Sequence, residues 1–156
     1  SGATRYLRPA SCSIRRRWLI LSSSSGSSIY RRKLDHFNVT FTEQEKIDLI
    51  KFDDFYSKEI KGKSIDFMKL DIEGNEFFAL EGMRNCINSI KIIQFEFGGC
   101  NIDSRTYFQD FYYYFNEFDF DIYRMRPNGL IKINSYKESD EYFHYSNFLA
   151  VNNRYL

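Results

Sequence analysis

Three carboxylates follow an apolar run near the middle of the sequence. The run is SIDFMKLDI (64–72), and Asp71, Glu73 and Glu76 fall within six residues at its end, with Gly74 among them. A carboxylate held next to a reacting hydroxyl can take its proton as a general base. Acidic side chains at the start of a helix are also stabilised by the exposed amides there, so they can serve as caps. Both interpretations are open for Asp71 and Glu73, whereas capping is the preferred one for Glu76.

A fourth carboxylate, Glu96, lies near the end of a second apolar run, IKIIQFEF (90–97), and Gly98 and Gly99 follow that run. In α/β sheets, ligands bind beyond the carboxyl ends of the strands. We therefore expect Asp71 and Glu96 to face one crevice from neighbouring strands. Two oxygen ligands would suit Mg²⁺, but no third ligand is evident and no metal site is predicted. Lys69 is expected to pair with a neighbouring acid or to extend its stem along the surface.

Strands and helices alternate along most of the chain, and this order predicts an α/β fold with a mainly parallel sheet. The near-continuous apolar residues of 64–72 indicate a strand buried on both faces. Its neighbour is the strand 90–97, joined to it through a helix over 75–83 that Gly82 stops or kinks. The other predicted elements are a strand at 36–41, a segment at 46–56 that begins as a strand and ends in two acids before a short helix, an aromatic helix over 106–118, and strands at 120–126, 130–134 and 145–152.

Composition divides the chain near residue 35. Residues 1–34 hold nine serines and contain no Phe, Asn, Asp or Glu, whereas all 16 Phe lie at or beyond Phe37. We predict a Ser/Arg-rich leader over 1–34, either flexible or of different origin, and one α/β domain over 35–156. The net charge of +1 gives no case for nucleic acid or an anionic membrane. No apolar stretch is long enough to span a bilayer, and the unpaired spacing of the three cysteines suggests a reducing, cytoplasmic setting.

The segment IDFMKLDIEGNEFFALEGM resembles the signature of the FkbM-type methyltransferases. The matching positions are Asp66, Lys69, Asp71, Glu73, Gly74, Glu76, Leu80 and Gly82. The segments DLIKFDDFY, IIQFEF and SNFLAVN resemble the parts of that family before and after it, so the likeness covers roughly residues 47–152. It implies a partial Rossmann-like methyltransferase sheet with an antiparallel C-terminal strand.

The resemblance also implies a function. The family transfers a methyl group from S-adenosylmethionine to a hydroxyl of a sugar or another small metabolite. Asp71, Glu73 and Glu96 are then the candidate catalytic residues, and Asp53 and Asp71 the candidate cofactor-binding residues. The partner is a small-molecule or carbohydrate acceptor, with no nucleic acid and no membrane.

One part of the family pattern is not found. The eight glycines do not form the D-x-G-x-x-x-G loop that holds the cofactor, so the resemblance is to the C-terminal half of a truncated domain. The chain alone is therefore expected to bind S-adenosylmethionine weakly or not at all, and to self-associate through an exposed sheet edge. Two alternatives to the enzyme are open: a non-catalytic α/β remnant or interaction module, and a sugar- or nucleotide-binding domain that uses the same crevice.

Overall fold

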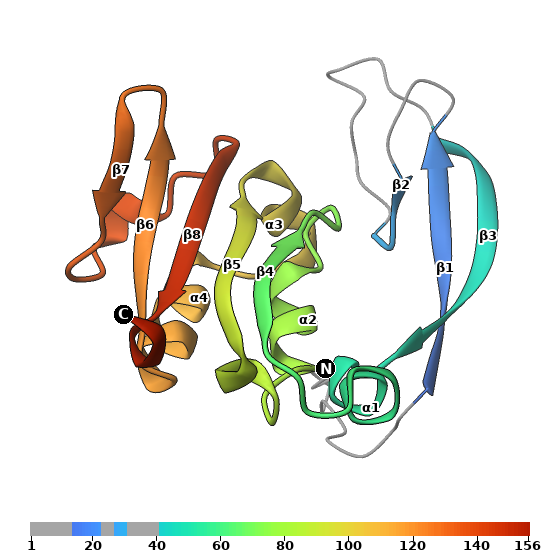
Figure 1. Cartoon of the computed structure of the whole chain (residues 1–156). Coiled ribbons are helices and arrows are strands. Elements are labelled where there is room, and N and C mark those ends of the chain that lie inside the picture. Colours follow the sequence, from blue (N-terminus) through green and yellow to red (C-terminus); the bar gives the residue numbers. More distant parts are fainter. Residues whose placement is uncertain (1–13, 23–26, 31–40) are drawn as a thin grey trace, which may run out of the picture.

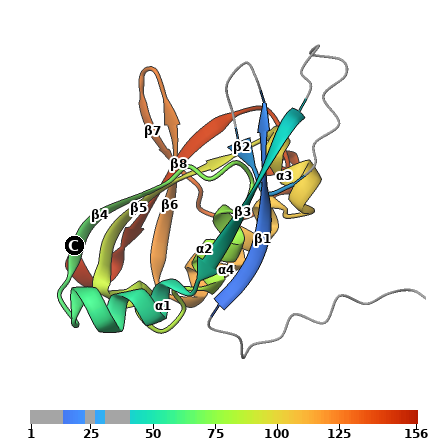
Figure 2. The same ribbon diagram turned by 90° about the vertical axis from the view of Figure 1, so that its right-hand side faces the viewer.

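The computed structural model of this chain describes residues 14–22, 27–30 and 41–156. Its first part is a three-stranded antiparallel sheet in the order β2-β1-β3 (Figures 1 and 2). The strands are β1 (Ile14–Ser22), β2 (Ser27–Ser28) and β3 (Phe41–Ile50). The predicted leader 1–34 thus contains β1 and β2. A strand was also predicted over 36–41. Residues 36–40 of it lie outside the described part of the chain, and Phe41 is the first residue of β3.

The second part is a five-stranded mixed sheet in the order β4-β5-β8-β6-β7 (Figure 1). Its strands are β4 (Ile65–Leu70), β5 (Ile90–Phe97), β6 (Phe120–Arg126), β7 (Gly129–Lys132) and β8 (Ser146–Asn152). β4 and β5 are parallel neighbours, as predicted. The other three strand pairs are antiparallel, so the prediction of a mainly parallel sheet was wrong.

The position of β8 explains this difference. β8 lies between β5 and β6 and runs against both, so β5 and β6 point in the same direction without pairing. β6 then turns back directly into β7 through a tight hairpin. An inserted strand of this kind comes from a pairing between distant segments, which the order of elements along the sequence does not reveal.

Helices connect the strands of the larger sheet. The α-helices are α1 (Phe52–Phe55), α2 (Glu76–Glu81), α3 (Gly99–Ser104) and α4 (Phe108–Glu117), and α1 continues into a π-helical turn (Tyr56–Ile60). Single 3₁₀ turns lie at Ile87–Ser89, Glu138–Asp140 and Asn153–Tyr155. α2 stops at Gly82, as predicted. Sequence reasoning did not predict α3, because its residues GCNIDS show no helical apolar pattern.

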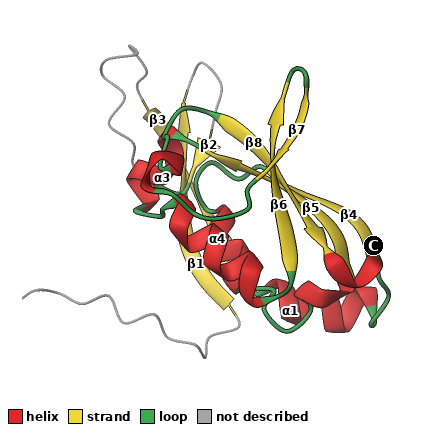
Figure 3. Cartoon of the chain, turned by 90° about the vertical axis from the view of Figure 1, so that its left-hand side faces the viewer, coloured by secondary structure: helices red, strands yellow, loops and turns green. Residues whose placement is uncertain are grey.

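An aromatic core lies between this sheet and the helices α2 and α4. Figure 3 shows α4 running along one face of the sheet. Phe95 of β5 is fully buried and stacks against Phe111 of α4 and Phe148 of β8, with ring centroids 4.9 and 5.4 Å away. Phe77 of α2 meets Phe111 edge to face, which joins the two helices. Fully burying one such side chain stabilises the fold by about 1.5–3 kcal/mol. These contacts hold α2 and α4 on one face of the sheet.

The strand β4 lies at the edge of this sheet, not in its interior. Leu70 points into the core, but the side chain of Phe67 is 52% exposed and that of Lys69 also faces solvent. The prediction that this strand is buried on both faces was therefore wrong. Its apolar residues alternate between the helix-covered face and a face that stays accessible in the described part of the chain.

Candidate functional site

The predicted carboxylates meet at the carboxyl ends of β4 and β5. The parallel register pairs Leu70 with Phe95, so Asp71 and Glu96 are the next residues of two adjacent strands. The negative charges of Asp71 and Glu73 both act on the Glu96 carboxyl group. The topology thus brings together all three residues that were predicted to be catalytic, because parallel neighbours end at the same edge of a sheet.

Asp71 is an exposed carboxylate with a cation beside it. Lys69 Nζ donates to Asp71 Oδ2 at 2.7 Å, which realises the pairing expected for Lys69. Both side chains are about half exposed, so the pair contributes little to stability. The hydrogen bond to Asp71 raises the pKa of Lys69. The lysine therefore stays charged and fixes the position of Asp71 at the mouth of the site.

The turn after β4 is held by a close contact with α3. Glu73 and Gly74 adopt left-handed backbone conformations, with φ of 52° and 91°. A Cβ atom on Gly74 would lie 2.6 Å from the carbonyl oxygen of Cys100, so only glycine fits there. The Cys100 thiol donates to Glu73 Oε2 at 3.1 Å. These contacts fix Glu73 beside the end of β5.

Glu76 lies beneath this turn and is 1% exposed. Its Oε1 atom accepts from the Ile72 amide at 2.9 Å, so the side chain braces the turn that carries Asp71 and Glu73. Burial raises the pKa of Glu76, and the backbone hydrogen bond from Ile72 acts against that rise. This arrangement agrees with the structural role preferred for Glu76 on sequence grounds.

Glu96 is the half-buried carboxyl group of the site. Burial is the largest cause that raises its pKa, and the charges of Asp71 and Glu73 raise it further. The neighbouring Tyr145 hydroxyl and the charge of Lys69 lower the pKa of Glu96 in turn. Sequence reasoning missed Tyr145, which lies 49 residues further along the chain and lies near Glu96 because Asn147 pairs with Glu96 across β5 and β8.

Asp53 is placed apart from these residues. It belongs to α1, before the start of β4, and its carboxylate accepts from the amides of Asn85 and Cys86 at 3.1 Å each. Both partners precede β5, so Asp53 lies at the amino ends of the parallel strands and joins α1 to the turn after α2 (Figure 1). The structure therefore does not bring the two predicted cofactor-binding residues, Asp53 and Asp71, together.

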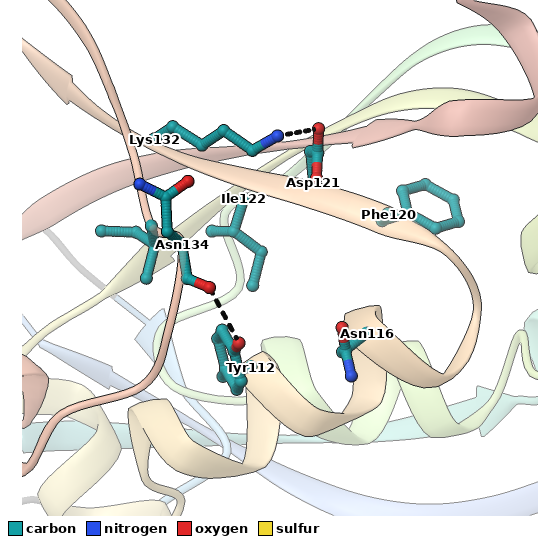
Figure 4. A pocket seen from close by; sticks show the side chains of 8 residues that line it. Tyr112, Asn116, Phe120, Asp121, Ile122, Lys132 and Asn134 are labelled. Carbon is teal, nitrogen blue, oxygen red and sulfur yellow. Dashed lines mark hydrogen bonds and ion pairs between the residues drawn. The ribbon is translucent and has the colours of Figure 1, made fainter.

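Two pockets lie away from the carboxyl edge. The first, of about 190 Å³, lies between α4 and the β6–β7 hairpin (Figure 4). At its rim Lys132 Nζ pairs with Asp121 at 2.5 Å, and the Tyr112 hydroxyl points to the Asn134 carbonyl at 3.5 Å. The second, of about 280 Å³, lies between α2 and α4 and includes Arg84 and Tyr113. Neither pocket is lined by the three carboxylates, which sit on an open edge.

Residues 14–22, 27–30 and 41–156 contain no group of three or more His, Cys, Asp or Glu side chains arranged to hold a metal ion. Within the same residues, none of the helices combines the length and apolar character needed to cross a membrane.

Comparison with known proteins gives one match. The family model described as "Methyltransferase FkbM domain" matches residues 13–122, from the start of β1 to the middle of β6. It includes the whole carboxylate site on β4 and β5. Searches of curated proteins and of solved structures found no match.

Proposed function

Because this chain belongs to the FkbM methyltransferase domain family, we propose that it methylates a hydroxyl group with S-adenosylmethionine as the methyl donor. The observation that supports this most strongly is the cluster of Asp71, Glu73 and Glu96 inside the matched segment, at the edge where α/β sheets bind ligands. The acceptor is a sugar or another small hydroxylated metabolite.

Glu96 is the proposed proton acceptor. When bound, S-adenosylmethionine would supply the methyl group: the acceptor oxygen would bond to the methyl carbon as the bond from that carbon to sulfur breaks, and S-adenosylhomocysteine would leave. Glu96 takes the proton that this hydroxyl loses, since burial and two neighbouring carboxylates raise its pKa and make it the stronger base. On sequence grounds the general-base role was open for Asp71 and Glu73, and Glu96 is preferred here because its pKa is raised.

Asp71 and Glu73 orient the acceptor in this proposal. Lys69 holds Asp71, and Cys100 holds Glu73, so both carboxylates are fixed before a ligand arrives. A carboxylate can accept hydrogen bonds from two hydroxyl groups of a polyol, and correct alignment of the reacting oxygen accounts for much of the rate of such reactions.

The residues present fit the charged end of the cofactor. Three carboxylates around one edge match a sulfonium cation, and Asp71 is the most exposed of the three. Asp53 does not contribute to this in the proposal, because its carboxylate is bonded to the Asn85 and Cys86 amides at the other end of the strands. No residue of the described part is assigned to the ribose or the base.

The experiment is transfer of a radiolabelled methyl group. The gene product is incubated with S-adenosylmethionine labelled on the methyl group and a panel of monosaccharides, polyols and, as controls, amines and thiols. We expect label in the hydroxylated acceptors with release of S-adenosylhomocysteine. Label confined to amines or thiols, or none with any acceptor, would contradict the proposal. The second outcome favours the non-catalytic module.

A further inference from the structure

A short aromatic segment, residues 142–145, lies between the 3₁₀ turn at Glu138–Asp140 and the start of β8. Its Tyr142, His144 and Tyr145 side chains are exposed, to 58% for Tyr142 and 64% for Tyr145. The rings of Tyr142 and His144 stack on each other, with centroids 5.5 Å apart and planes 17° from parallel. Apolar surface that gathers in one exposed place marks a binding site more often than apolar residues scattered singly.

The pairing of β5 with β8 places this segment beside the carboxylates. Glu96 of β5 is opposite Asn147 of β8. A Cβ atom at Gly98 would lie 3.0 Å from Tyr145 Cα, so the backbone of Tyr145 runs directly against the turn that follows β5. The Tyr145 hydroxyl oxygen lies 3.5 Å from Asn147 Nδ2, so the ring extends toward the residue opposite Glu96. The Tyr145 ring and the Glu96 carboxylate therefore border the same part of the edge.

The segment is held in place on the side away from β8. The Glu141 carboxylate accepts from the amides of Phe108 and Gln109, at the start of α4, at 2.8 and 2.9 Å. Phe143 packs its ring against that of Phe97, with centroids 5.3 Å apart. A surface that is ordered before a ligand arrives loses little conformational freedom on binding.

The two kinds of surface at this edge match the two kinds of surface on a cyclic sugar. Ionised carboxylates only accept hydrogen bonds, so they bind the hydroxyl groups. The C–H groups on one face of a sugar ring form an apolar surface that packs on the negatively polarised face of an aromatic ring. A linear polyol has the same hydroxyl groups but no rigid apolar face, so this edge should favour the ring.

We propose that Tyr142, His144 and Tyr145 form an acceptor-binding surface next to Glu96, on which the apolar face of a cyclic sugar packs while its hydroxyl groups reach the carboxylates. The proposal rests on the function proposed above and narrows its acceptor from hydroxylated metabolites in general to sugar rings. Tyr145 is the residue that determines this preference, because its backbone and ring connect the segment to the end of β5.

The test is saturation-transfer difference NMR on the whole chain, with methyl β-D-glucopyranoside and sorbitol as ligands. The aromatic protons of the protein are saturated, and the signal is read on the C–H protons of the ligand. We expect a signal for the glucoside and a much weaker one for sorbitol. Tyr145→Ala should weaken glucoside binding by about two- to tenfold, and Tyr142→Ala, at another exposed residue, should weaken it as well.

Two variants serve as controls. Tyr145→Phe keeps the ring and should bind the glucoside like the native chain. Tyr113→Ala removes a ring that is 56% exposed on α4, beside the pocket between α2 and α4, and should also leave binding unchanged. No glucoside signal, equal signals for both ligands, or equal losses in Tyr145→Ala and Tyr113→Ala would overturn the proposal. So would a loss in Tyr145→Phe, or stronger binding of tetramethylammonium, which would make the edge a cation site.

Binding needs no catalysis, so this inference and the proposed function fail in different ways. Glucoside binding that depends on Tyr145, without methyl transfer to any acceptor, would refute the function and leave the sugar-binding surface. Methyl transfer to the glucoside and to sorbitol with equal kcat/KM, unchanged in Tyr145→Ala, would refute the surface and leave the function.

Discussion

Glu76 and Glu96 are two carboxyl groups with raised pKa values and different surroundings. Glu96 is half-buried beside two other carboxylates and a phenol, at an edge that a ligand can reach. Glu76 is 1% exposed, and its Oε2 atom has no hydrogen-bond partner among the described residues. An ionised carboxylate in that position loses its hydration without full compensation. We therefore assign proton transfer to Glu96 and support of the turn to Glu76.

The buried position of Glu76 predicts a pH-dependent stability difference. Its pKa in the folded chain lies above the ordinary value of 4.5. The stability that the protonated form provides is thus fully present below pH 4.5 and is lost as the pH rises through the folded pKa. Glu76→Gln cannot ionise and keeps an oxygen that can accept from the Ile72 amide. Its melting temperature relative to the native chain should rise from pH 4 to pH 8.

The control for this prediction is Glu138→Gln, at an exposed residue of a 3₁₀ turn. Its melting temperature should follow that of the native chain across the same pH range. If the melting temperatures of Glu76→Gln and the native chain differ by the same amount at every pH, ionisation of Glu76 does not destabilise the fold and the prediction is wrong.

The two turns that follow β4 and β5 place the functional groups. The β4–α2 turn brings Gly74 against Cys100, and the β5–α3 turn brings Gly98 against Tyr145. The side chain of Asn101 braces the second turn, because its Oδ1 accepts from the Gly98 amide at 2.8 Å and its amide group donates to Thr106. Each turn therefore depends on a close approach that a side chain would block.

Gly74→Ala and Gly62→Ala form a matched pair that tests this dependence. Both glycines have a left-handed backbone, with φ of 91° and 79°, but a Cβ at residue 62 would meet nothing within 4 Å. Each substitution should cost about 1 kcal/mol or more through the strained conformation alone. Gly74→Ala should lose more free energy of unfolding than Gly62→Ala, measured by urea denaturation. Equal losses of unfolding free energy in the two variants would mean that the contact between Gly74 and Cys100 adds no constraint, and would contradict the prediction.

Several elements could be predicted because their signals are local. The strands 90–97 and 120–126 have the predicted limits. In both cases the extent of the apolar run and the turn residues next to it indicate where the strand begins and ends. The meeting of Asp71 with Glu96 also followed, because strands joined through a helix tend to be parallel neighbours. α3 was missed, since its order comes from Asn101 and not from an apolar pattern. Tyr145 was missed because its position near Glu96 depends on where β8 enters the sheet.

The whole molecule has a larger sheet with helices on one face and a free edge at β4 in the described part of the chain. Phe67 and Lys69 lie on its accessible face, and Phe67 is 52% exposed. An edge strand with exposed apolar residues offers a template for pairing with another chain. The self-association predicted from the sequence stays a prediction, and this edge is the route by which we expect it.

We expect the chain to form concentration-dependent oligomers through β4. Phe67→Lys should shift the distribution toward monomer in size-exclusion chromatography with light scattering, because it places a charge on the edge. Ile102→Lys is the control, since Ile102 is 60% exposed on α3 and lies off the edge. Monomers of the native chain at every concentration, or equal effects of both substitutions, would contradict the pairing.

The central claim is that Glu96 accepts the hydroxyl proton in methyl transfer. The most direct measurement compares kcat of Glu96→Gln with that of the native gene product near pH 8, together with the melting temperature. Loss of a general base lowers the rate by about 10²–10⁴-fold, so we predict a fall of that size. The melting temperature should not fall, because the surroundings of Glu96 disfavour its charge. A variant that keeps kcat within about threefold of the native value would contradict the account.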